Sequence, residues 1–259
     1  MRRFAGGTLF DVWRLRQPGE MPLVIGHRGA SARETENTAA AFRRARADGA
    51  DGVELDVLLA ATGEVMVFHD DDLARLGGRP DRVGDLPYRT LREVRLPGGA
   101  VIPTLEEALE ACGPDLLVNV ELKAMELEHA RIAVLVDAVA AVIEATASGA
   151  RVLISSFNPW AVRLWMRRAP AVRAALLFER ASMLPLRRAW LAPWLRPAAL
   201  NPELVLCTPD RVAAWRRRGY MVNVWTVDDP AALAVCRRMG VDGIITNDPA
   251  RARAALASV

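Results

Sequence analysis

Two of the chain's three histidines stand where they could act on a bound ligand. His27 and Arg28 follow an apolar run, and His69 ends a second such run in the stretch VFHDDDL. An imidazole titrates near neutral pH, so a pair of imidazoles can divide the work of a general base and a general acid. His129 differs because it falls in ELEHARI, on an expected helix, and we interpret it as structural.

Charged residues also recur two apart inside apolar segments. Glu54 and Asp56 in VELDV would project from one face of a strand, and so would Glu121 and Lys123 in VELK. Side-by-side carboxylates repel unless a cation or a proton lies between them. Three carboxylates supply an all-oxygen site suited to Mg²⁺ or Ca²⁺ rather than to zinc. The alternative, paired charges on a solvated sheet edge, is weakened by the recurrence and by the histidines.

The segments that must position these residues alternate between strand-like and helical patterns. Eight strands are expected, at 23–27, 52–57, 116–122, 151–157, 174–178, 204–208, 221–227 and 243–247. Amphipathic segments lie between most of them, several ending in a glycine. A ninth strand, at 64–70, follows the second after a connection too short for a parallel crossover, so we expect it to return antiparallel as a hairpin arm.

Repeated βα units of this kind indicate an α/β fold, a (β/α)8 TIM barrel. A doubly wound open sheet is the alternative, weakened by the absence of a G-x-G-x-x-G turn. Functional side chains of a barrel gather at the carboxyl ends of its strands, where Asn119 and Trp225 also fall. We expect one barrel domain at 21–259, with an irregular insertion at 70–103 and an N-terminal extension at 1–20.

Composition excludes a disordered or a fibrous protein. The 259 residues are 52% hydrophobic and 25% charged, which predicts a globular chain. The pI is about 9.1, but the net charge of +3 comes without a long basic run, so we expect anionic small molecules rather than nucleic acid as partners. Three scattered cysteines, no apolar run of about 18 residues and no signal-like start favour a cytoplasmic protein.

Ordered motifs across residues 23 to 250 resemble those of the glycerophosphodiester phosphodiesterase family. They are GHRGASARETENTAAAF, GVELDV, VFHDDDLAR, IPTLEEAL, VNVELK, SSF, VNVWTVDD and GVDGIITNDP. The resemblance implies a hydrolase of glycerol and lipid metabolism that converts glycerophosphodiesters to sn-glycerol 3-phosphate and an alcohol, with one divalent cation, Mg²⁺ or Ca²⁺. Two departures bear on substrate choice: Thr35 stands where a proline is common, and 73–85 matches the family pattern loosely.

The resemblance also implies roles for ten residues. They are acid/base catalysis by His27 and His69, cation binding by Glu54, Asp56 and Glu121, phosphate binding by Arg28 and Lys123, an apolar wall for glycerol by Trp225, and support of Arg28 or the metal by Glu36 and Asn37. In the implied mechanism the glycerol 2-hydroxyl attacks phosphorus, the alcohol leaves, and water opens the cyclic phosphate. Which histidine is the first base stays open. Gly29 is expected to let backbone and ligand come close together.

Two other functions stay open. One is a lysophospholipase D that acts on lysophospholipids, and the other is a barrel that binds phosphodiesters without catalysis, against which the intact histidines and carboxylates argue. The stretch at 182–200 mixes Trp190, Trp194 and leucines with arginines. It is either a buried helix and loop or a surface for peripheral contact with anionic head groups at the inner membrane surface. The alcohol head group and the oligomeric state stay unknown.

Overall fold

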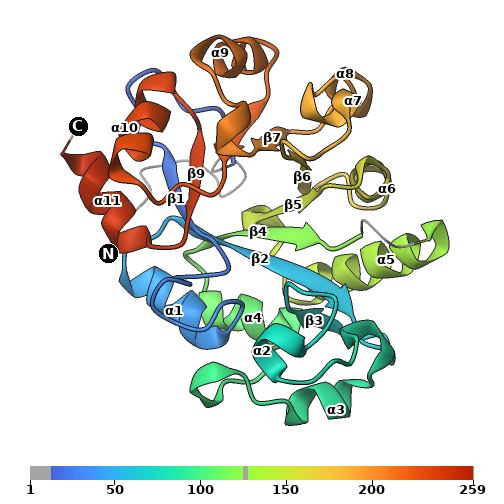
Figure 1. Ribbon diagram of the computed structural model, residues 1–259. Helices are drawn as coiled ribbons and strands as arrows, with labels where there is room; N and C mark the ends of the chain where they lie inside the picture. The colour runs from blue at the N-terminus through green and yellow to red at the C-terminus, as the bar shows by residue number, and fades with distance from the viewer. Residues whose placement is uncertain (1–12, 125–127, 259) are drawn as a thin grey trace.

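Parallel strands form a closed ring at the centre of the molecule in the computed structural model, which describes residues 13–124 and 128–258 (Figure 1). Eight strands make the ring within these residues: β1 (Leu23–Gly26), β2 (Gly52–Leu59), β4 (Leu117–Leu122), β5 (Val152–Ser156), β6 (Arg173–Phe178), β7 (Ala199–Pro202), β8 (Met221–Val224) and β9 (Gly243–Thr246). Each pairs in parallel with its neighbours, and β1 pairs with both β2 and β9. The predicted (β/α)8 barrel is confirmed.

Helices cover the outside of this ring (Figure 1). They are α1 (Ala39–Ala47), α4 (Leu105–Cys112), α5 (His129–Ala145), α6 (Pro159–Arg168), α7 (Leu184–Arg187), α8 (Ala192–Leu195), α9 (Pro209–Arg217), α10 (Pro230–Met239) and α11 (Pro249–Ala257). Polar side chains such as Asn158 and Asp248 cap helices just after a strand ends, which fixes the turn beside the barrel mouth. None of the helices in the described residues has the length and hydropathy that crossing a bilayer requires.

Alternation along the strands sends apolar and polar side chains to opposite sides. On β2, Val53, Leu55 and Val57 pack in the cluster between the strands and the helices. Glu54 and Asp56 point to the other face, where they meet Glu121 of β4. A second apolar layer fills the barrel at the amino ends of its strands, with members Trp13, Leu23, Ile25, Leu117, Leu153, Ala175, Ala199, Met221 and Ile245. The polar layer therefore lies at the carboxyl end.

The ninth predicted strand is β3 (Val65–Val67), which pairs antiparallel with β2, as expected. The insertion that follows contains α2 (Ala74–Gly77), α3 (Tyr88–Glu93) and two short 3-10 turns. An apolar cluster of its own, including Leu73, Val83 and Leu91, packs it against the hairpin. Residues 1–12 of the predicted N-terminal extension lie outside the described residues. The rest of the extension packs under the barrel through Trp13, which is buried.

One predicted strand was wrong. Residues 204–208 were expected to be extended, but Leu204–Leu206 forms a 3-10 turn and the strand is β7, a few residues earlier. The apolar composition of residues 204–208 suggested a buried strand, but Val205 is 56% exposed. All four residues of β7 are buried instead. A buried Asn201 bonded to Asn223 stabilises β7 from within the fold. The other seven predictions overlap observed strands.

Gly29 follows β1 with φ +87°, and a Cβ there would lie 2.6 Å from backbone and side-chain atoms of Ala41. The close approach in the structure is to helix α1, and the approach of a ligand that the sequence suggests stays a prediction. We predict that Gly29→Ala lowers the free energy of unfolding by about 1–3 kcal/mol more than backbone strain alone, because of this overlap.

Gly63→Ala isolates the strain, since Gly63 has φ +98° and open space around it. It should cost about 1–2 kcal/mol for the left-handed backbone. Urea unfolding measures both variants, and equal losses would mean that the contact with α1 does not matter.

Candidate active site

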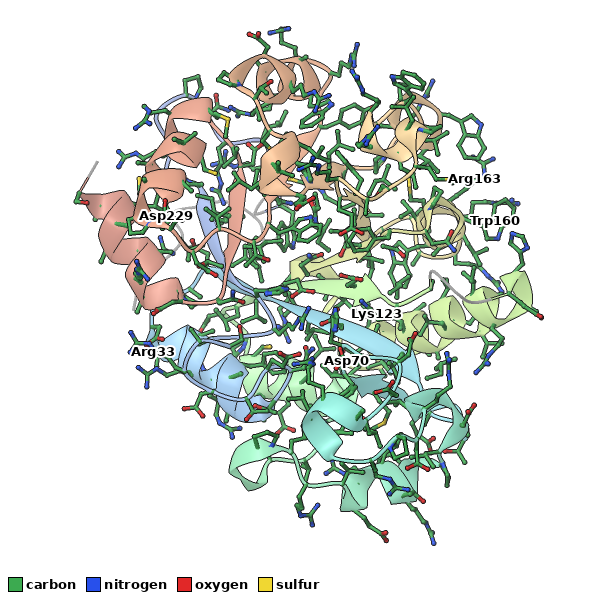
Figure 2. The ribbon with its side chains drawn as sticks, in the orientation of Figure 1. Arg33, Asp70, Lys123, Trp160, Arg163 and Asp229 are labelled. Atoms are coloured by element: carbon green, nitrogen blue, oxygen red, sulfur yellow. The ribbon has the colours of Figure 1, made fainter. Side chains whose placement is uncertain are left out.

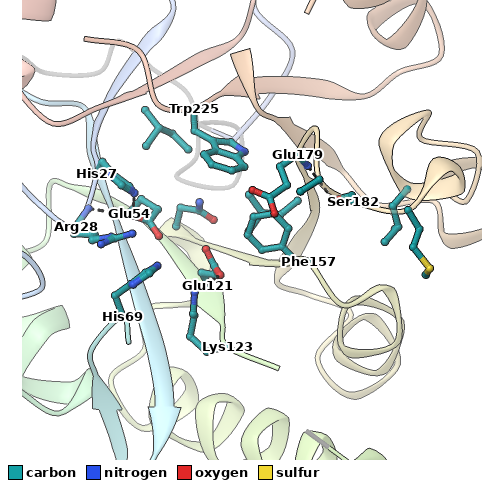
Figure 3. Close-up of a pocket in the computed structure, with 16 residues that line it drawn as sticks. His27, Arg28, Glu54, His69, Glu121, Lys123, Phe157, Glu179, Ser182 and Trp225 are labelled. Carbon is teal, nitrogen blue, oxygen red and sulfur yellow. Dashed lines mark hydrogen bonds and ion pairs between the residues drawn. The ribbon is translucent and has the colours of Figure 1, made fainter. Parts of the chain in front are cut away.

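A cavity of about 480 Å³ opens at the carboxyl ends of the strands (Figure 3). Seven of the ten predicted site residues line it: His27, Arg28, Glu54, His69, Glu121, Lys123 and Trp225. The other three, Asp56, Glu36 and Asn37, contact these residues from behind or beside the cavity. The structure thus brings together all ten residues. They come from β2 and β4, from the residues that follow β1, β3, β4 and β8, and from the turn before α1.

The three carboxylates form one buried cluster. Glu54, Asp56 and Glu121 each offer an oxygen within 4.8 Å of the others. Burial, then the charges of Asp56 and Glu121, raise the pKa of Glu54 well above its usual range. Burial, then Asp56, raise the pKa of Glu121 to about 7. Such a set is unfavourable as three bare anions, and a hard divalent cation with oxygen ligands relieves the repulsion. The residues present fit a cation.

Asn119 adds a neutral oxygen to this cluster. Its side chain lines the cavity between Glu54 and Glu121 along the paired strands, and its Oδ1 is buried without a hydrogen-bond partner in the described residues. Buried polar atoms are almost always hydrogen-bonded, so an unpartnered amide oxygen suits a cation or a ligand donor. Sequence analysis had marked Asn119 as polar at a strand end but had given it no role.

The two basic residues of the site, Lys123 and Arg28, form ion pairs with the carboxylates. Lys123 Nζ lies 3.1 Å from Glu121 Oε1 and 3.7 Å from Asp56 Oδ1. Arg28 Nε lies 3.4 Å from Asp56 Oδ2, and its Nη1 donates to Glu36 at 2.8 Å. Asn37 Nδ2 donates to Asp56 Oδ2 at 2.8 Å. The sequence left open whether Glu36 and Asn37 support Arg28 or the metal site. In the structure Glu36 contacts Arg28, and Asn37 contacts the carboxylate cluster.

The ring of His27 is held by a chain of hydrogen bonds from the end of β9. Its Nδ1 lies 2.8 Å from Asn247 Oδ1, and Asn247 Nδ2 donates to Asp228 at 2.6 Å. A carboxylate only accepts, so it fixes which way the Asn247 amide points. Nδ1 of His27 must then carry the proton, which leaves Nε2 as an acceptor 4.0 Å from Glu54. Burial, then Arg28, lower the pKa of His27, which favours this neutral form.

His69 is held differently, by a carboxylate. Its Nδ1 lies 2.6 Å from Asp70 Oδ1, and Asp70 Oδ2 accepts from Arg75 Nε at 2.7 Å. Burial opposes ionisation of Asp70, but the bonds from Arg75 and His69 lower its pKa. Arg75 also pairs with Glu36. Helix α2 of the insertion therefore contacts both the partner of His69 and the partner of Arg28.

One wall of the cavity is mainly apolar, although Glu179 and Ser182 also lie on it (Figure 3). Trp225 donates from Nε1 to Asn201 O at 2.8 Å and meets Phe157 edge-on, with ring centroids 5.6 Å apart. Leu177, Met183 and Leu186 continue this wall toward α7. His129 lies away from the cavity, against the ring of Trp160, which agrees with its structural interpretation.

Sequence analysis missed Phe157, Asp70, Arg75, Asn247 and Asp228. Asp70 and Arg75 could in principle be found in the sequence, because Asp70 follows His69 directly and Arg75 lies in the helix that comes next, α2. Asn247 and Asp228 also had a signal, since each is a polar residue within a few positions of a strand end. Their partners across the barrel mouth were not visible in the sequence.

Comparisons with known proteins agree with this geometry. The profile of the glycerophosphoryl diester phosphodiesterase family matches residues 27–251. A glycerophosphodiester phosphodiesterase of Caldanaerobacter subterraneus subsp. tengcongensis is 34% identical over 236 residues, covering 88% of this chain and 94% of its own. The glycerophosphodiester phosphodiesterase of Thermotoga maritima superposes with a TM-score of 0.72 at 30% identity, covering 89% of this chain and 96% of its own. An Oleispira antarctica phosphodiesterase, solved in complex with the product sn-glycerol-3-phosphate, has a TM-score of 0.83 at 25% identity, covering 92% and 97%.

Proposed function

The chain belongs to the glycerophosphoryl diester phosphodiesterase family, and we propose that it hydrolyses glycerophosphodiesters to sn-glycerol 3-phosphate and an alcohol with one bound divalent cation, Mg²⁺ or Ca²⁺. The observation that carries the proposal is the convergence of two histidines, two basic residues and three buried carboxylates on one cavity. A relative of the same fold binds sn-glycerol-3-phosphate, which supports a glycerophosphate ligand here.

A diester phosphate resists attack because its anionic oxygens repel a nucleophile. In this cavity Glu54, Asp56 and Glu121 would hold the cation, which when bound supplies charge neutralisation and polarises the phosphoryl group. Arg28 and Lys123 would bind the phosphate oxygens, Arg28 as a planar fork and Lys123 as a point charge. Their contacts with the carboxylates already aim both groups at the cavity.

The two histidines have different partners and therefore suit different proton transfers. His27 presents an unprotonated Nε2, so it suits the base that takes the proton of the attacking glycerol 2-hydroxyl. His69 has its Nδ1 bonded to the Asp70 carboxylate, which leaves its Nε2 to act as the acid that protonates the leaving oxygen. The roles reverse when water opens the cyclic phosphate. Trp225 and Phe157 offer the glycerol an apolar wall.

We predict that Asn247→Ala lowers kcat about tenfold or more with little change in KM. The substitution removes the acceptor that holds His27 Nδ1–H, so it costs part of the about 10²- to 10⁴-fold that general base catalysis supplies. Steady-state kinetics on glycerophosphocholine measure the effect. Ser31→Ala is the matched control, because Ser31 donates to the same Asn247 oxygen without touching His27. Equal losses in both variants would contradict a specific role in holding His27.

The proposal is tested by assaying glycerophosphocholine, glycerophosphoethanolamine and lysophosphatidylcholine side by side, with and without a chelator. Turnover of at least one substrate that stops with chelator supports a metal-dependent phosphodiesterase. Binding without release of product would favour the non-catalytic barrel instead.

A lysophospholipase D activity is the second candidate function. It is favoured by the apolar wall of the cavity, which runs past Leu177 to Met183 and Leu186 on the side that Trp225 lines. An acyl chain on the glycerol would be buried against that wall, whereas a soluble diester has no acyl chain to bury there. Faster turnover of lysophosphatidylcholine than of glycerophosphocholine would select this candidate.

A further inference from the structure

Large apolar side chains are exposed beside the mouth of the cavity, on and around α6, α7 and α8. We call them the α6–α8 surface, with members Trp160, Met183, Leu184, Trp190 and Trp194, of which Met183 is 74% exposed and Trp190 61%. Helix α6 packs against α8, and α6, α7 and α8 lie together on one side of the barrel (Figure 1), where Trp160 and Arg163 also lie (Figure 2). Monomeric soluble proteins rarely expose apolar patches of this kind without a binding role.

Arginines outnumber acidic residues around this surface. Residues 157–169 and 180–202 contain seven arginines and no aspartate or glutamate, while Glu179 and Glu203 flank the second range and Glu203 accepts from the backbone N–H of Arg180. Arg163 lies over the ring of Trp194, 4.3 Å from its centroid, and Arg168 pairs with Asp137 of α5. Arg188 is exposed on α7's end, and Arg187 beside it is half-buried. The excess of arginines therefore favours a partner that is anionic at its rim and apolar within.

The α6–α8 surface is also continuous with the candidate active site. Met183 and Leu186 line the cavity, while Met183 and the next residue, Leu184, are exposed on the outer surface. Ser182, the residue before Met183, lies on the same side of the cavity as Glu179 and Phe157 (Figure 3). Whatever binds the surface thus lies at the entrance of the apolar wall.

We propose that the α6–α8 surface docks the enzyme on a bilayer that carries anionic lipids. Tryptophan suits the boundary between head groups and acyl chains because one end of its ring system is apolar and the other can donate a hydrogen bond. Arginines around it meet the negative surface potential of the bilayer. In the docked enzyme the cavity would face the lipid, where a diester with an acyl chain resides. That such a diester is the substrate rests on the proposed function.

Vesicle sedimentation tests the docking. Wild-type enzyme should sediment with vesicles of phosphatidylcholine and phosphatidylglycerol, less with phosphatidylcholine alone, and less at high salt. Arg187→Glu with Arg188→Glu should weaken binding at least about tenfold, since each basic residue near the membrane contributes about fivefold. Leu184→Ser with Trp190→Ser should weaken it on both vesicles. Trp194 is left intact because it also packs on Arg163.

The matched control is Val235→Ser with Arg238→Glu, which removes one exposed apolar and one exposed basic residue from α10. It should bind vesicles like wild type. The inference is overturned if wild type does not prefer anionic vesicles, if the surface variants bind normally, or if the control loses binding equally. It is also overturned if light scattering shows a dimer that Trp190→Ser breaks, since the surface would then pair two copies.

Turnover of soluble glycerophosphocholine separates this inference from the proposed function. All these variants should keep wild-type turnover and wild-type melting temperature, because they lie outside the cavity lining. Vesicle binding without any turnover by the wild type would defeat the proposed function but leave the docking surface. Normal turnover without vesicle binding would overturn the docking surface but leave the proposed function.

Discussion

Turnover should fall about 10²- to 10⁴-fold when either His27 or His69 is replaced by alanine, the range that a general acid or base contributes. Both rings line the cavity, and each has its Nδ1 engaged by a neighbour, so that Nε2 is the nitrogen left for substrate. Substrate binding should change little, because in the proposed function Arg28 and Lys123 bind the phosphate. Steady-state kinetics measure kcat and KM, and calorimetry measures binding.

His129→Ala is the control for this prediction. His129 contacts the ring of Trp160 and lies away from the cavity, so its loss should leave kcat near the wild-type value. If all three histidine variants lose activity alike and melt at lower temperature, the losses reflect folding, and the acid/base assignment is wrong.

Cation affinity should fall more than about 100-fold in Glu54→Gln and in Glu121→Gln. Even partners that only support metal ligands contribute about 10- to 100-fold, and these residues would be ligands themselves. Added Mg²⁺ or Ca²⁺ should raise the melting temperature of the wild type and not of the variants. In chelator, the variants should melt no lower than the wild type, because each substitution removes one of three repelling carboxylates.

Glu144→Gln is the matched control, since Glu144 is an exposed carboxylate on α5. It should respond to cation like the wild type. Variants that keep both activity and the cation-induced rise in melting temperature would show that the carboxylate cluster is not the cation site.

Cation binding should also depend on pH in a defined direction. Without a cation the pKa of Glu121 is about 7, so this carboxyl carries a proton below neutral pH. A ligand must lose its proton to bind, and affinity should therefore rise as pH increases through about 7. Titration calorimetry in two buffers of different ionisation enthalpy should show proton release near neutral pH. Affinity that does not change with pH would contradict an ionised Glu121 as ligand.

Much of the site could be predicted because its residues break a local pattern. Glu54 and Asp56 stand in an otherwise apolar strand at a spacing of two, which places both on the face opposite Val53 and Leu55. Burying such charges is costly without a partner, so the sequence itself signals the cluster. The barrel was predictable for a similar reason, since seven of its strands are short apolar runs between amphipathic helices.

What could not be predicted depends on contacts between distant segments. Asn247 holds His27 across 220 residues, and nothing local to either residue reveals the pairing. β7 was missed because Ala199–Pro202 has only one large apolar residue, Leu200, and no β-branched side chain, whereas its burial and the Asn201–Asn223 bond depend on distant segments. The neighbouring Leu204–Leu206 has those side chains but forms a turn, because tertiary packing overrides local propensity.

The most direct measurement is a ³¹P NMR time course of the enzyme with glycerophosphocholine and Mg²⁺ or Ca²⁺. We predict that the diester resonance is replaced by that of sn-glycerol 3-phosphate, with choline released. A transient cyclic phosphate should come before the product, and chelator or His27→Ala should abolish the change. Formation of phosphocholine and glycerol would mean that the other ester bond is cleaved. That result, or turnover unaffected by chelator, would contradict the proposed reaction.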